Sequence, residues 1–300
     1  MINLIASIYE IDDIVKYKEA GAHSIIMGLP FFSARPVSTF SEEDIKLARE
    51  ITLRQDMNLY VLMNRMFCEE ELKRAKEMLV FLKAVGVDGI YFGDEALLYM
   101  ANELDMTSKL IYNPDTLITN SMDVSYYLNE GISMVCISKE ITLADMIEIG
   151  RHNENQVEVT IHGRLNMMHS KRKLLTNYFN HLGIDYEVNA KRTLSLKEVT
   201  RKDLMPIIED DLGTHVFSGF TLVAFEEVNK LVENGIINLK IEDLFHNASY
   251  VIEALNLYQG ILSGKEDAHQ IYLDYQKEYF KDHIDTGFFY QKTSLIKEEL

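Results

Sequence analysis

Cysteine is scarce in this chain of 300 residues. Its two cysteines, Cys68 and Cys136, stand far apart, with no second cysteine near either one. This spacing encodes neither a disulfide framework nor a cysteine-rich metal site. The nine histidines do not form the H-E-x-x-H pattern of zinc enzymes. We therefore expect no metal ion, and we interpret both cysteines as small hydrophobic residues of the interior.

Long apolar runs and flexible linkers are also missing. The apolar start, Met1–Ala6, is short, has no basic flank and soon meets acidic residues, so we interpret it as neither a signal peptide nor a membrane span. We accordingly expect a cytoplasmic protein with no membrane partner. No stretch rich in proline, glycine or serine divides the sequence, which favours one large domain.

The sequence has fewer basic than acidic residues. Thirty lysines and arginines face 47 aspartates and glutamates, which gives a formal net charge of −17. This balance argues against broad, sequence-independent binding of nucleic acid, because such binding depends on clustered basic side chains. Local basic contact stays open at clusters such as Lys171-Arg172-Lys173.

A glycine followed by a short apolar segment recurs along the rest of the chain. Gly21, Gly86, Gly131 and Gly235 each stand just before a short apolar segment, a pattern typical of a helix that ends on glycine and is followed by a buried strand. Eight segments qualify as strands, and each is followed by a helical pattern. They are Ile2–Ala6, Ser24–Met27, Asn58–Met63, Gly89–Phe92, Lys109–Tyr112, Met134–Ile137, Val157–Ile161 and Asn238–Ile241.

Eight alternating units over about 250 residues predict an α/β fold of the TIM-type (β/α)8 barrel. A doubly wound open sheet is the alternative, but no G-x-G-x-x-G turn follows the first strand. The seventh unit is too long, which predicts an inserted subdomain over 180–219 in which Leu204–Ile208 pairs with His215–Phe217. We expect the barrel to span 1–263 and a C-terminal tail, 264–300, to pack on it.

The connection that follows the seventh strand is rich in polar side chains. It runs from His162 to Phe179 and contains imidazole, guanidinium, ammonium, hydroxyl and amide groups. Active sites of this fold lie at the carboxyl ends of the strands, so we interpret the connection as a loop-borne site. The simpler alternative is a solvated basic loop. Ser170-x-x-Lys173 also matches a serine–lysine nucleophile pattern, although neighbouring Lys171 and Arg172 make that match weak.

The sequence resembles the collagenase-like peptidases, peptidase family U number thirty-two. The resemblance rests on His162-Gly163, on Glu209-Asp210, on Leu239-Lys240-Ile241-Glu242 and on further matches in the same order along the chain. Those further matches are Ser170, Arg172, Leu175, Asn177, Tyr178 and Gly213-Thr214-His215-Val216-Phe217-Ser218.

The resemblance implies either proteolysis, largely by inherited name, or hydroxylation of tRNA wobble uridine, in which several members work as pairs of paralogues. Many members hold an iron–sulfur cluster through cysteines, two of which would align with Asn166 and Lys173. Amide and ammonium groups cannot replace such thiolates as a set. We therefore expect no cluster and no other cofactor in this chain.

Three hypotheses of function remain open. The chain is a peptidase, or the cluster-less partner of a cysteine-bearing paralogue, or a non-enzymatic scaffold; a homo-oligomer is a further assembly that the sequence leaves open. Strand ends and family motif together give the predicted site. Its expected catalytic residues are His162, Glu209, His215 and Glu242, and its expected substrate-binding residues are Arg35, Asn64, Arg164, Ser170, Lys171, Arg172, Asn177 and Tyr178.

Overall fold

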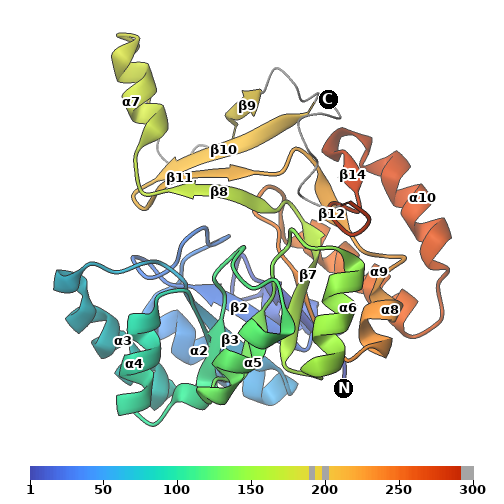
Figure 1. Ribbon diagram of the computed structural model, residues 1–300, viewed down its shortest axis with the longest axis horizontal. Coiled ribbons are helices and arrows are strands. Elements are labelled where there is room, and N and C mark those ends of the chain that lie inside the picture. Colours follow the sequence, from blue (N-terminus) through green and yellow to red (C-terminus); the bar gives the residue numbers. More distant parts are fainter. Residues whose placement is uncertain (189–192, 198–202, 292–300) are drawn as a thin grey trace.

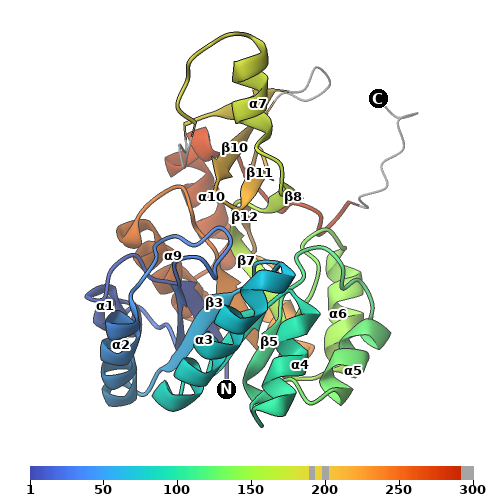
Figure 2. The same cartoon turned by 90° about the vertical axis from the view of Figure 1, so that its left-hand side faces the viewer.

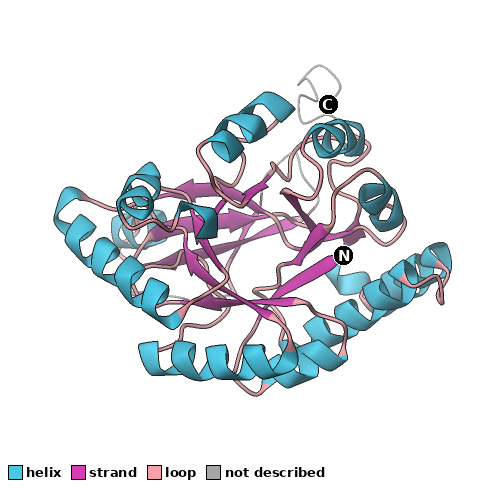
Figure 3. Cartoon of the chain, turned by 90° about the horizontal axis from the view of Figure 1, so that it is seen from below, coloured by secondary structure: helices cyan, strands magenta, loops and turns pink. Residues whose placement is uncertain are grey.

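The computed structural model describes residues 1–188, 193–197 and 203–291. Eight parallel strands form a closed barrel in which β13 pairs with both β1 and β7. Helices surround the strands, as the view along the barrel shows (Figure 3). The predicted (β/α)8 barrel is confirmed. Its strands are β1 (Asn3–Ser7), β2 (Ser24–Gly28), β3 (Asn58–Met63), β4 (Gly89–Phe92), β5 (Leu110–Tyr112), β6 (Met134–Cys136), β7 (Val157–Gly163) and β13 (Asn238–Ile241).

Several barrel helices begin at a side-chain cap that the sequence supplies. Ser41 and Asp44 form a capping box at the start of one helix, and Thr142 and Asp145 form another, so free N–H groups of the first turn are satisfied. These helices cover the outer faces of the strands and bury one large apolar core. They are α1 (Asp13–Glu19), α2 (Glu42–Gln55), α3 (Leu72–Val85), α4 (Glu95–Glu103), α5 (Ser121–Asn129), α6 (Leu143–His152), α8 (Val228–Glu233) and α9 (Ala248–Leu262).

A second sheet stands above the carboxyl ends of the barrel strands (Figure 1). Its strand order is β8-β11-β10-β9, and β10 and β11 form the hairpin that the sequence predicts, with Ile208 opposite His215. We call residues 164–219 the arm. Its elements are β8 (Asn166–Ser170), α7 (Leu174–His181), β9 (Ser195–Lys197), β10 (Leu204–Asp210) and β11 (Gly213–Phe217).

The connection after β7 is therefore not a loop. Its middle is β8, which pairs antiparallel with β11, and its end is α7, which projects away from the barrel (Figure 2). The sequence hides this strand because Asn166–Ser170, at the edge of a small sheet, neither alternates polar and apolar residues nor forms an apolar run.

The chain returns from the arm through β12 (Thr221–Val223), which pairs antiparallel with β7. The C-terminal segment then adds α10 (Ala268–Glu278) and β14 (Ile284–Asp285), and β14 pairs with β12. Tyr275 of α10 is buried against Tyr250 of α9. This segment therefore packs beside β7, β12 and α9. None of the helices in the described part of the chain combines the length and apolar content of a membrane span.

Candidate active site

A buried ionic network forms the floor of the barrel mouth. The carboxylate of Glu158 on β7 accepts hydrogen bonds from Tyr91 at 2.5 Å and from the thiol of Cys136 at 3.0 Å, and it pairs with the Lys240 ammonium at 2.9 Å. Burial lowers the pKa of Lys240, but Glu158 and Glu242 raise it more, so the net shift is upward. Burial also raises the pKa of the Cys136 thiol. Cys136 is thus a buried thiol, as predicted, and a poor nucleophile. The same prediction is wrong for Cys68, which is exposed.

A small pocket lies directly above this floor, where the carboxyl ends of the strands meet. Four predicted residues line it, namely Arg35, Asn64, Arg164 and Glu242. The cavity measures about 30 Å³, which is room for a water molecule or two rather than for a nucleobase. In this conformation the pocket is nearly filled by its own side chains.

Charge in the pocket is paired. Glu242 lies 2.7 Å from Lys139, and 36% of its side chain is exposed. Burial raises the pKa of Glu242, but Lys139 and Lys240 outweigh that effect and lower it to about 2. A carboxylate that stays ionised at neutral pH is suited to accept hydrogen bonds and not to donate a proton.

Arg35 forms the wall of the pocket toward the arm. Its backbone has φ +55°, a left-handed conformation that costs energy for a residue with a side chain. The guanidinium bonds both oxygens of Asp115, at 2.8 and 3.0 Å. The amide oxygen of Asn64 accepts from the backbone N–H of Ala34 and so fixes the same loop. Two predicted substrate-binding residues thus hold one loop in place.

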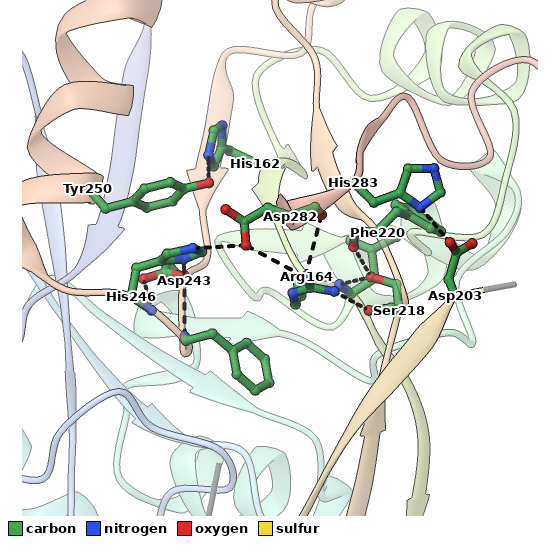
Figure 4. Close-up of polar contacts among 12 residues, drawn as sticks. His162, Arg164, Asp203, Ser218, Phe220, Asp243, His246, Tyr250, Asp282 and His283 are labelled. Carbon is green, nitrogen blue, oxygen red and sulfur yellow. Dashed lines mark hydrogen bonds and ion pairs between the residues drawn. The ribbon is translucent and has the colours of Figure 1, made fainter. Parts of the chain in front are cut away.

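His162 does not line this pocket, although it stands near the carboxyl end of β7, two residues before Arg164. A bulge in the β7–β13 pairing brings Ile241 opposite His162. Its ring is fully buried among Phe225, Tyr250, Tyr258 and Tyr275, and Nε2 lies 2.9 Å from the Tyr250 hydroxyl (Figure 4). Burial lowers its pKa to about 3. A catalytic role for His162 stays a prediction, and these surroundings are typical of a structural histidine.

A chain of charged groups links the barrel to the C-terminal segment (Figure 4). His246 lies between Asp243, at 2.7 Å, and Asp282, at 3.4 Å, and its ring stacks on Tyr250. Arg164 approaches Asp282 at 3.8 Å and donates to the carbonyl of Ser218 at 2.9 Å. Arg164 therefore ties together the two ends of the arm and the C-terminal segment.

This linkage predicts a loss of stability at alkaline pH. Burial lowers the pKa of His246, but Asp243 and Asp282 raise it more, to about 9 from an ordinary 6.5. A raised pKa contributes stability that is complete below 6.5 and is lost as pH rises through 9, which corresponds to roughly 3 kcal/mol. Thermal unfolding followed from pH 6 to pH 10 checks this. A His246→Asn variant should lose most of that slope, and an unchanged slope would contradict the assignment.

The two predicted catalytic residues of the arm have different surroundings. Glu209 is buried, and its carboxylate accepts from the backbone N–H groups of Leu175, at 2.7 Å, and Thr176, at 3.2 Å. It thus holds the start of α7. His215 is also buried and lies between His169 and Asp210. Neither residue lines the barrel pocket, and catalytic roles for both stay predictions.

The remaining predicted residues lie on or near the exposed start of α7. Lys171, Arg172, Asn177 and Tyr178 are exposed, and Tyr178 retains 57% of its accessible surface. The serine–lysine pattern does not assemble here: the hydroxyl of Ser170 accepts from the backbone of Arg172, and Lys173 pairs with Asp211 at 3.1 Å. These side chains form a surface, whereas Arg35, Asn64, Arg164 and Glu242 form a pocket.

A sequence model of peptidase family U32 matches residues 10–299. The chain belongs to peptidase family U32. A Bacillus subtilis relative named tRNA hydroxylation protein P2 is 29% identical, and the match covers 94% of this chain and 95% of the relative. A second B. subtilis relative, tRNA hydroxylation protein P1, is 20% identical, and the match covers 81% of this chain and 58% of that protein.

Structural comparison supports the fold alone. Phosphoribosyl anthranilate isomerase from Thermus thermophilus superposes with a TM-score of 0.50 at 9% sequence identity, covering 88% of this U32 chain and all of the isomerase. Such low identity carries no inference about chemistry.

The iron–sulfur cluster expected in many U32 members does not fit this chain. Of the two aligned positions, Asn166 is buried, with an amide oxygen that has no hydrogen-bond partner among the described residues, and Lys173 is a surface cation. No group of three or more potential metal-ligating side chains occurs in the described residues.

Several charged residues of the pocket and its floor were not predicted from the sequence. Glu158, Lys240 and Lys139 line or support the barrel mouth. A signal for two of them was present, because Glu158 is the one acidic residue of the buried strand β7 and Lys240 is the one lysine of the buried strand β13. A charge within a barrel strand usually faces the interior, where another charge must compensate it.

Proposed function

We propose that this U32 protein is the cluster-less subunit of a tRNA hydroxylation system, acting on wobble uridine together with a cysteine-bearing paralogue. The similarity to tRNA hydroxylation protein P2 supports this most, since it extends over nearly the full length of both chains. A second relative named for tRNA hydroxylation occurs in the same organism and is considerably longer. A short and a long member side by side are what a pair of paralogues requires.

The arm supplies a surface suited to RNA. Lys171 and Arg172 are exposed beside Tyr178, which combines cations for phosphate with an aromatic face on which a base can stack. The protein as a whole carries a net charge of −17, so repulsion elsewhere would confine contact to the arm. The family name implies a peptidase, but no observation among the described residues favours peptide cleavage.

Deletion of the gene tests the proposal directly. Mass spectrometry of tRNA nucleosides should show loss of 5-hydroxyuridine derivatives from the deletion strain and their return on complementation. Affinity purification of the natively expressed chain should recover the paralogue. Unchanged nucleosides in the deletion strain would overturn the proposal.

Replacement of the basic cluster tests the RNA surface. Alanine at Lys171 and Arg172 should weaken binding of tRNA by the assembled complex about tenfold and should reduce its salt dependence, because two phosphate contacts are lost. Filter binding at several salt concentrations measures both effects. Alanine at Lys83, on the barrel helix α3, provides a matched control that should leave binding unchanged. Equal binding by both variants would contradict the assignment.

A further inference from the structure

Three titratable side chains of the arm form a line. The carboxylate of Asp210 lies 3.4 Å from Nε2 of His215, and Nδ1 of His215 lies 3.0 Å from Nδ1 of His169. The two histidines are directly opposite each other on β11 and β8, and their rings are nearly parallel, with an interplanar angle of 16°. His215 is fully buried, whereas His169 is exposed.

This geometry sets the proton positions. A carboxylate only accepts hydrogen bonds, so His215 must donate to Asp210 through Nε2–H. A neutral His215 then has its lone pair on Nδ1 and accepts from Nδ1–H of His169. His169 is consequently left with its lone pair on Nε2, at the outer end of the line.

We propose that Asp210, His215 and His169 form a proton relay whose outer end, His169 Nε2, acts on a ligand in the cleft between arm and barrel mouth. This inference rests on the proposed function for the identity of its substrate, which would be a nucleotide of the bound RNA. The relay itself is independent of that identity. The sequence predicts His215 as a catalytic residue, and the pairing of β8 with β11 adds His169.

The cleft beside His169 is large enough for such a ligand. Its cavity measures about 180 Å³, six times the volume of the barrel pocket. Its charged lining residues, beside His169, are Arg35, Arg65, Lys171, Asp115 and Asp211. Lysine and arginine beside a hydrogen-bonding base suit a phosphate-bearing nucleotide.

The line can move a proton without leaving a charge uncompensated. Burial lowers the pKa of His169, and His215 and Arg35 lower it further, so His169 is a neutral acceptor near pH 7. When its Nε2 takes a proton from an acidic N–H or O–H of the ligand, the pair becomes cationic. Asp210 balances that charge: burial raises its pKa, but hydrogen bonds from His215 and from the backbone of Leu212 and Gly213 outweigh burial and lower it. The exposed edge of His169 then returns the proton to water.

Nitrogen NMR on protein labelled at histidine tests the relay in the isolated chain. Long-range proton–nitrogen spectra at pH 7 should show the Nε2–H tautomer for His215 and the Nδ1–H tautomer for His169. Asp210→Asn should disturb the His215 tautomer, while Asp211→Asn, a neighbouring surface change, should not. An Nδ1–H tautomer at His215 would overturn the relay.

Complementation then tests its use. In a strain whose deletion removes the tRNA modification, His169→Gln and His215→Gln should each reduce restored modification at least tenfold while the folded chain still binds tRNA. Normal modification by either variant overturns the relay but leaves the proposed function standing. If the deletion itself leaves the modification intact, the proposed function fails, and the NMR result still decides whether the relay exists.

Discussion

Replacing Lys240 with methionine should lower the free energy of unfolding by about 3–5 kcal/mol, because the change leaves the buried Glu158 carboxylate without its cation. Tyr91 and Cys136 would still donate to Glu158, but two neutral donors do not replace an ammonium at 2.9 Å. Urea denaturation at pH 8 measures the loss.

A double variant provides the control. Glu158→Gln combined with Lys240→Met removes both charges while the amide can still accept from Tyr91. It should be within about 1.5 kcal/mol of the parent protein, because a compensated pair contributes little net stability. A double variant as unstable as Lys240→Met would show that packing, and not the unpaired charge, governs this floor.

The Gly163→Ala substitution should lower the free energy of unfolding at least as much as Lys240→Met does. The residue has φ +116°, and a Cβ there would lie 1.7 Å from the backbone carbonyl oxygen of Glu242. No side-chain adjustment relieves a clash with backbone, so the strand end that carries Glu242 and Asp243 must move. We expect a loss of more than about 4 kcal/mol, or failure to fold. Soluble yield and the thermal midpoint give the result.

Gly86 is the matched control. It also has a positive φ, +75°, at the end of α3, but no atom lies within 4 Å of the position that an alanine methyl group would take there. Alanine at Gly86 should cost only about 1–2 kcal/mol, which is the cost of a left-handed conformation. Similar losses at Gly163 and Gly86 would mean that the clash is relieved with little loss of stability.

The barrel could be predicted from sequence because its signals are local. Each strand is a short apolar run, and glycine marks the helix end before several of them, so every predicted strand corresponds to a barrel strand. The boundaries differ most at β7, where the prediction ends at Ile161 and the strand continues to Gly163. His162 is one of the two added residues, so the direction of its side chain is set by the strand and could not be predicted from a strand that ends at Ile161.

The site was less predictable because it depends on pairing between distant segments. Arg35, Asn64, Arg164 and Glu242 follow four different strands, and their shared position at the strand ends was enough to bring them together. Nothing in the sequence indicates which side chains the other site residues contact. Asp282 lies far along the chain from Arg164, and His169 meets His215 only because β8 pairs with β11. Such long-range register leaves no periodic trace in the sequence.

The strand β7 pairs with both β13 and β12. Its first part closes the barrel against β13, and its end pairs with β12, so the chain leaves for the arm at Gly163 and returns opposite it at Leu222. Because the arm begins and ends at paired positions of β7 and β12, its length and surface can change without altering the pairing of β7 with β13 that closes the barrel. Exchange of arms between U32 relatives should therefore leave the pairing of β7 with β13 intact.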